Sequence, residues 1–225
     1  VEVTATPQVQ KGAKAIPFKN VVYEYSLVHA LKDEKYIKVP AVVTRKDFKP
    51  EQYSQEDLDK EKLIDGIKLH IDTQSALDIY ARTYGKPLVK PFVLVVAKDT
   101  EHSKHIKEYL TSYDFYRGYY KDKVLEINSA QRGIEKDENI NQLLSLEHSD
   151  NKIEIVIHVN MLKEGWDVNN LYTIVPLRAS ASETLTEQTI GRGLRLPYGE
   201  RTGVDKGDRL SIVSHDKNEA IVSLA

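Results

Sequence analysis

The chain has 225 residues, enough for one or two domains with a buried core. Hydrophobic residues make up 40% and charged residues 29%, as in globular proteins. The formal net charge is −2, so nucleic-acid binding would have to use local groups and not an overall basic field. Cysteine is absent, which excludes disulfides and thiolate chemistry and suits a reducing, cytoplasmic location. No apolar run reaches the roughly 18 residues of a membrane helix, so we expect no contact with a membrane.

The first 89 residues have a mixed pattern. In chain order we expect a short strand over Val1–Thr6, a linker over 8–19, a helix over 23–31, a strand over 37–44, a charged loop over 46–62 and a helix over 63–84. Because the first residue is Val1 and no signal-like segment follows, we expect the chain to be part of a longer protein.

From residue 91 onward, strand and helix patterns alternate. Apolar runs predict strands over 92–97, 124–128, 153–159, 171–177 and 210–213, and the segments between and after them predict helices over 100–110, 140–146, 182–190 and 217–224. Alternation of this kind is typical of a parallel sheet with helices on both faces. Ligands of such sheets bind beyond the carboxyl ends of the strands.

Two short strings follow predicted strands and carry residues suited to phosphate chemistry. The arginine string, residues 188–195, reads Gln-Thr-Ile-Gly-Arg-Gly-Leu-Arg. Arginine is permanently charged and forks onto phosphate oxygens, so Arg192 and Arg195 could grip one phosphate together. Gly191 lets the backbone approach a ligand closely. The tryptophan string, residues 161–167, reads Met-Leu-Lys-Glu-Gly-Trp-Asp and lies upstream.

Both strings resemble conserved motifs of superfamily 2 helicases and translocases. Residues 188–195 match the Gln-x-x-Gly-Arg-x-x-Arg pattern of motif VI, and residues 163–168 resemble the Glu-Gly-Trp-Asp form of motif V. That form is typical of the Res subunits of type III restriction enzymes, the family that the chain resembles most. Residues 4–7, Thr-Ala-Thr-Pro, resemble motif III, and residues 91–97 lie where motif IV begins. The motifs are in the family's order and span most of the chain.

The resemblance implies roles for these residues in ATP hydrolysis. Arg192 and Arg195 would act as arginine fingers on the γ-phosphate, a contribution worth about 10³–10⁵ in rate. Gln188 would sense the same phosphate. In the tryptophan string, Asp167 would meet the ribose or the motif VI arginines, and Gly165 would allow a tight turn. Gly191 would bring the backbone close to the nucleotide.

Three further residues would couple nucleotide state to nucleic acid. Thr4 and Thr6 of motif III would transmit the nucleotide state to strand movement. In early motif V, a hydroxyl residue usually contacts the nucleic-acid backbone. Here Val159 stands at that position, so Asn160 or a backbone amide would have to make the contact.

The resemblance also implies a fold and a division of the chain. We expect residues 1–20 to be the end of a first RecA-like motor domain and a linker, residues 21–89 a mixed α/β insertion, and residues 90–225 a second RecA-like motor domain with a parallel sheet. The implied cofactors of the intact enzyme are ATP and Mg²⁺. The implied partners are DNA, the first motor domain and a modification methyltransferase subunit.

Some parts of such an enzyme are missing from the sequence. It contains no Gly-x-x-x-x-Gly-Lys-(Ser/Thr) phosphate-binding loop, no acidic pair after an apolar strand and no Glu-x-Lys nuclease tripeptide. We therefore expect the chain alone to bind neither ATP nor a metal tightly, to be inactive in isolation and to lack the nuclease domain.

Several other interpretations remain open. The arginine string could be a basic turn at a helix end, the parent could be a repair helicase, and the chain could be a non-catalytic nucleic-acid-binding module. His102 and His105 have metal-like spacing, but we expect them on a solvated helix face. The tyrosine cluster Tyr113, Tyr116, Tyr119 and Tyr120 could stack on bases, although we favour an anchor for a loop over the sheet.

Overall fold

The structure is a computed structural model that describes residues 8–11, 14–23, 25–33, 35–128, 133–159, 168–177 and 189–215. It divides into two compact units, Val1–Asp33 and Glu34–Ala225. In the first unit, β1 (Gln8–Lys11) pairs antiparallel with β2 (Lys14–Pro17), and α1 (Leu27–Asp33) follows. The range predicted to be a linker thus contains a strand pair. The predicted strand over Val1–Thr6 lies outside the described residues.

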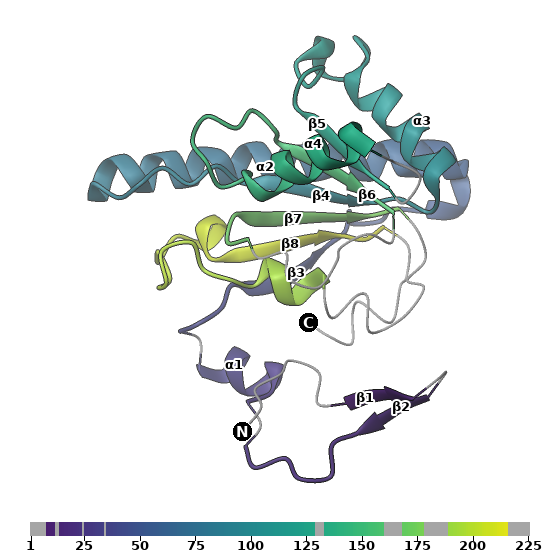
Figure 1. The fold of residues 1–225 in the computed structure, drawn as a ribbon. Helices are drawn as coiled ribbons and strands as arrows, with labels where there is room; N and C mark the ends of the chain where they lie inside the picture. Colours follow the sequence, from purple (N-terminus) through teal and green to yellow (C-terminus); the bar gives the residue numbers. More distant parts are fainter. Residues whose placement is uncertain are drawn as a thin grey trace. The chain divides into compact units, whose positions relative to one another are not determined.

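The second unit is built on a six-stranded sheet with the strand order β3-β8-β7-β4-β6-β5 (Figure 1). All five strand pairings are parallel, which confirms the predicted RecA-like sheet. The strands are β3 (Val39–Val43), β4 (Phe92–Val96), β5 (Val124–Ile127), β6 (Ile155–His158), β7 (Leu171–Pro176) and β8 (Arg209–Val213). β4 and β6 are buried along their whole length, as their uninterrupted apolar runs predict.

Three longer helices connect these strands. They are α2 (Gln55–Tyr84), α3 (Thr100–Thr111) and α4 (Gly133–Leu144), and the short 3₁₀ turns are η1 (Pro50–Gln52), η2 (Tyr116–Gly118) and η3 (Asp205–Gly207). α2 begins earlier than predicted because Ser54 caps it: the Ser54 hydroxyl accepts a hydrogen bond from the Asp57 amide at 3.1 Å. It ends at Gly85, whose φ of 61° is in the left-handed region.

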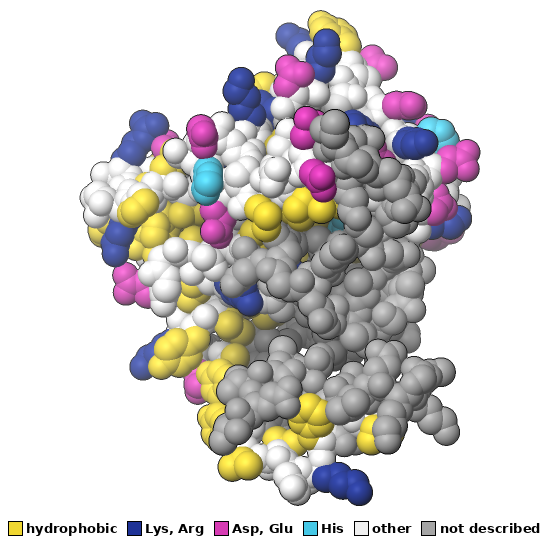
Figure 2. Space-filling model, viewed as in Figure 1, with side chains coloured by type: hydrophobic (Ala, Val, Ile, Leu, Met, Phe, Trp, Pro, Cys, Tyr) yellow, Lys and Arg dark blue, Asp and Glu magenta, His cyan; other side chains and the backbone are white. Residues whose placement is uncertain are grey.

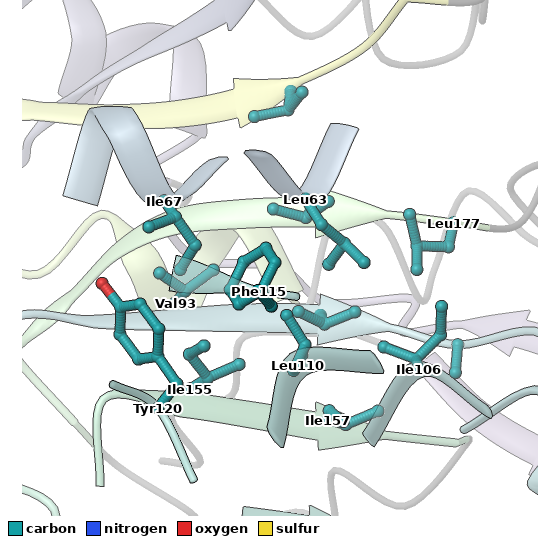
Figure 3. Close-up of a cluster of buried hydrophobic side chains, with 14 of the residues drawn as sticks. Leu63, Ile67, Val93, Ile106, Leu110, Phe115, Tyr120, Ile155, Ile157 and Leu177 are labelled. Carbon is teal, nitrogen blue, oxygen red and sulfur yellow. The ribbon is translucent and has the colours of Figure 1, made fainter. Parts of the chain in front are cut away.

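The main core lies between one face of the sheet and two helices. Leu63 and Ile67 of α2 and Ile106 and Leu110 of α3 converge on strand residues such as Val93 (Figure 3). α2 approaches β7 so closely at Gly66 that an added Cβ would lie 2.5 Å from Cγ2 of Val175. The helical residues 189–193 pack against the opposite face of the sheet. Gly193 contacts Leu210 of β8, and the Leu210 and Val213 side chains point to opposite faces of this strand, with Val213 in the main core.

The edge strand and the longest helix of this unit come from the range predicted to be an insertion. β3 pairs with β8, and α2 packs against β4, β7 and β8. Residues 39–84 therefore contribute to the same sheet and the same core as the residues that follow position 90. The sequence pattern could not show that these residues join the sheet. The partner of β3 lies some 170 residues further along the chain (Val39 pairs with Arg209), where no local pattern could indicate it.

Candidate functional site

The end of the arginine string has one buried and one exposed face. Thr189, Ile190, Gly193 and Leu194 are buried, whereas Gly191 and Arg195 are exposed and Arg192 is half-buried. Residues three and four apart lie on the same side of a helix, so Ile190 and Leu194 face the sheet together. Arg192 is half-buried within the helical residues, and the exposed Arg195 follows them, in a bridge to Ile37. Both arginines are therefore at least partly accessible to solvent; Gln188 lies outside the described residues.

The two glycines of this string have different surroundings. A Cβ added at Gly193 would lie 2.6 Å and 2.7 Å from the Cδ atoms of Leu210, which is fully buried on β8. A Cβ added at Gly191 would meet nothing within 4 Å. Gly193 therefore allows the helix end to approach the sheet, whereas Gly191 leaves open space beside the arginines.

The string ends beside the amino end of the sheet's edge strand. Arg195 forms an antiparallel bridge with Ile37, and the Lys38 amide donates to the Leu194 carbonyl at 2.7 Å. Both partners precede β3. This differs from the expectation that sites gather at the carboxyl ends of the strands.

The tryptophan string is defined here only by its flanks. Gly165, Asp167 and Asn160 lie outside the described residues, as do Thr4 and Thr6 of motif III. On one side of the string β6 ends at His158. On the other side, Val168 is buried and Asn170 donates to the carbonyls of Lys90 and Leu146 at 2.8 and 2.9 Å. The string thus joins the carboxyl end of β6 to the amino end of β7, two buried strands that β4 separates in the sheet.

A pocket of about 1080 Å³ lies at the carboxyl ends of β4 and β7. It is lined by residues from the first turns of α2 and α3 and from the segment after β4, among them Gln55, Asp59, Lys98, His102, His105 and Leu177. Basic and acidic side chains are mixed in this lining. The same mixture covers the described part of the face drawn in Figure 2.

His102 is bonded within this pocket and is not simply solvated. Its Nε2 lies 3.0 Å from the buried Asp59 carboxylate, and its Nδ1 accepts a hydrogen bond from the Lys98 amide at 3.2 Å. Because an amide donates to Nδ1, the proton of the neutral ring lies on Nε2 and points at Asp59. Gln55 donates to the other Asp59 oxygen at 2.9 Å. Asp59 therefore fixes the segment after β4, although 43 residues separate it from His102.

No group of three or more His, Asp or Glu side chains within the described part of the chain is placed to hold a metal ion. None of the helices there is long and apolar enough to cross a bilayer.

The tyrosine cluster includes both anchors and exposed rings. Tyr120 is fully buried and packs with the buried Phe115 at a ring-centroid distance of 5.7 Å. Tyr113 and Tyr119 are exposed, and the Lys123 ammonium lies 3.6 Å from the centre of the Tyr119 ring. The buried pair confirms that this segment is anchored over the sheet.

A cluster of charged residues lies at the carboxyl end of the sheet, beside its edge strand β3. Arg45 grips the Asp65 carboxylate through two nitrogens, one of them at 2.8 Å, and reaches Glu61 at 2.6 Å. Burial alone would raise the pKa of Asp65, but hydrogen bonds from Arg45 and Lys68 outweigh it and hold that pKa below its ordinary value. The buried His215 also lies on this carboxylate, with Nε2 3.0 Å away.

This cluster predicts a loss of stability in mild acid. Burial lowers the pKa of His215 below its ordinary 6.5, and the opposing effect of Asp65 only partly compensates. The unfolded chain therefore takes up this proton at a higher pH than the folded chain. The contribution to stability is complete above pH 6.5 and is lost as the pH falls toward the folded pKa, by at most about 1.4 kcal/mol per pH unit.

The variant His215→Gln tests this expectation, because its amide nitrogen takes the place of Nε2 and can still donate to Asp65 but does not titrate. Urea unfolding between about pH 7.5 and about pH 5.5 should give a free energy that falls less steeply for the variant than for the unaltered chain. Equal slopes for the two proteins would show that His215 does not contribute.

Comparison with known proteins gives partial sequence matches. The chain is 37% identical over 103 residues to the Res subunit of the type III restriction-modification enzyme EcoP15I from Escherichia coli, a match that covers 38% of this chain and 10% of the relative. It is 36% identical over 104 residues to the EcoPI Res subunit of Escherichia phage P1, covering 39% of this chain and again 10% of the relative. The chain thus spans about a tenth of the length of these relatives. No family model matches the chain.

Solved structures share the fold at low sequence identity. A fragment described as an HsdR subunit of a type I restriction enzyme from Vibrio vulnificus YJ016 has a TM-score of 0.55 and 21% identity, covering 93% of this chain and 37% of that one. The ATP-dependent Type ISP restriction-modification enzyme LlaBIII bound to DNA has a TM-score of 0.51 and 18% identity, covering 98% of this chain and 17% of that one. Part of the chain is therefore homologous to the Res subunits of type III restriction-modification enzymes, and its sheet has the RecA-like fold of helicase motor domains.

Proposed function

We propose that the chain is the second RecA-like motor region of an ATP-dependent DNA translocase, the Res subunit of a type III restriction-modification enzyme. One observation carries this most directly. The arginine string packs Ile190 and Gly193 on the sheet and leaves Arg192 half-buried and Arg195 exposed. Two nearby guanidinium groups that solvent can reach suit the oxygens of a γ-phosphate that is bound mainly by a neighbouring domain.

In this function the chain's own residues bind and orient the γ-phosphate of ATP. Arg192 and Arg195 hold the γ-phosphate and stabilise the negative charge that spreads over its oxygens as it is transferred to water. Gln188 senses the same phosphate, Gly191 gives the backbone room beside it, and Gly165 and Asp167 link the nucleotide to domain closure. ATP with its Mg²⁺ supplies the phosphoryl group, held by the first motor domain.

The remaining assignments concern DNA and partner proteins. Asn160 contacts the nucleic-acid backbone, and Thr4 and Thr6 couple its movement to the nucleotide state. Duplex DNA and a modification methyltransferase subunit are the partners, as the partial homology to Res subunits suggests. The LlaBIII enzyme, whose fold is shared, was solved bound to DNA.

ATP hydrolysis by the intact protein that contains this chain tests the proposal. We expect hydrolysis to require DNA and to rise with DNA length, since a translocase hydrolyses ATP as it moves. Hydrolysis that is independent of DNA would contradict the translocase function. DNA binding without hydrolysis would show instead that the protein is a non-catalytic nucleic-acid-binding module.

A further inference from the structure

A buried lysine lies directly before the edge strand, on the same face of the sheet as the arginine string. The Lys38 side chain is 0% exposed. Its ammonium donates to the carbonyl oxygens of Asn169 at 2.9 Å and Leu171 at 2.8 Å, and it lies 3.8 Å from the centre of the Tyr172 ring. The side chain therefore holds the segment that joins the tryptophan string to β7.

The backbone of the same residue holds the arginine string. The Lys38 amide donates to the Leu194 carbonyl at 2.7 Å, and the neighbouring Ile37 forms the bridge to Arg195. Arg201 fixes this segment further, because its Nε donates to the Ile37 carbonyl at 3.1 Å. One residue thus contacts the end of the arginine string through its main chain and residues 169–171, which follow the tryptophan string, through its side chain.

This arrangement is costly for folding. Burial lowers the pKa of Lys38 well below its ordinary value, although the carboxylates of Asp208 and Glu147 act in the opposite direction. A well-packed apolar side chain would avoid that desolvation cost. It could not donate to two carbonyls, and so could not fix the distance between the two segments.

We propose that Lys38 is a positioning residue that links residues 169–171 to Arg195, so that a shift of one displaces the other. This rests on the proposed function of Arg195. A movement of residues 168–171 carries the Lys38 ammonium with it, and the short peptide from Ile37 to Lys38 passes the movement to Leu194 and Arg195. The position of the arginine finger thereby depends on the position of residues 169–171, which directly follow motif V.

The chain offers a closely matched control at Lys90. This lysine also lies just before a strand, β4, and its ammonium also donates to two backbone carbonyls, those of Ser149 and Asn151, both at 2.7 Å. That loop is distinct from the end of the arginine string, and Lys90 is half-buried where Lys38 is fully buried. Lys38→Met and Lys90→Met therefore each remove an ammonium that donates to two carbonyls, but only Lys38 is also bonded to the arginine string.

ATP hydrolysis by the intact enzyme with DNA distinguishes the two variants. We expect Lys38→Met to lower kcat by about 10- to 100-fold with little change in KM, because a displaced finger fails in the transition state and not in ground-state binding. Lys90→Met should change kcat by less than about twofold at a similar change in Tm. If the two variants have the same kcat, the link is wrong. Should Lys38→Met fail to fold, Lys38→Gln takes its place. Its amide can still donate but is uncharged and shorter, so we expect an intermediate loss of kcat, and an unaltered kcat would overturn the proposal.

A double variant separates failure of the link from failure of the proposed function. If Lys38 acts through Arg195, Lys38→Met adds almost nothing to the loss caused by Arg195→Ala, whereas independent effects multiply. Multiplied effects would overturn the link. If Arg195→Ala alone leaves hydrolysis intact, the arginine-finger function itself fails.

Discussion

Replacing Arg192 or Arg195 by alanine should nearly abolish ATP hydrolysis by the intact enzyme. Removal of an arginine finger costs about 10³–10⁵ in kcat, since the lost guanidinium no longer stabilises the charge on the transferred phosphoryl group. Lysine should restore little at either position, because a single ammonium cannot fork onto two phosphate oxygens. Steady-state hydrolysis with saturating DNA measures both effects.

Two controls show whether the loss of kcat comes from the chemical step of ATP hydrolysis. Arg82→Ala removes an exposed arginine of α2 that pairs with Asp78 at 2.9 Å, and it should leave kcat unchanged. DNA affinity should be retained in Arg192→Ala and Arg195→Ala, because the fingers act on the nucleotide. Hydrolysis that stays within tenfold of the unaltered enzyme would mean that the arginine string is only a basic turn at a helix end.

The central strands could be predicted from sequence because each is defined by its own residues. β4, β6 and β7 are short apolar runs buried by their neighbours, and a run of that kind indicates a buried parallel strand wherever it occurs. The alternation with helices then restricted the architecture to a parallel sheet. These properties are local, so no knowledge of distant partners was needed.

The start of α2 differs from the prediction because most of its buried positions before Leu63 are charged. Asp59 and Lys62 are buried in the first turns, where burial of hydrophobic residues would be expected, so residues 46–62 resemble a solvated loop. The available signal was local: Ser54 precedes Asp57 by three residues, which is the spacing of a helix N-cap.

Contacts that shape the site could not be predicted from sequence, since they join distant segments. Nothing in the residues around Lys38 indicates that its ammonium reaches Asn169, and nothing near Asp59 indicates a bond to His102. The side of the arginine string that packs on the sheet was accessible in principle. Burial of Ile190 and Leu194, four residues apart, fixes which side of a helix faces the sheet.

The two glycines of the arginine string should respond differently to the same substitution. Gly193→Ala places a methyl group 2.6 Å from the fully buried Leu210, which has no room to retreat, so the folded state should lose about 1–3 kcal/mol. Gly191→Ala places the methyl group in open space within the helical residues 189–193, so stability should rise by up to about 1 kcal/mol. Urea unfolding of the two variants measures the difference.

The effects of the two substitutions on activity should be the reverse of their effects on stability, when both variants are assayed in the folded state. Gly193 serves packing, so any Gly193→Ala enzyme that remains folded at low temperature should keep most of its kcat. Gly191 is the proposed point of close approach to the nucleotide, where an added methyl group displaces the phosphate from Arg192 and Arg195 and lowers kcat/KM for ATP. If Gly191→Ala is both stable and fully active, the nucleotide does not approach this backbone. In that case the two arginine side chains must reach the nucleotide from a surface that does not include Gly191.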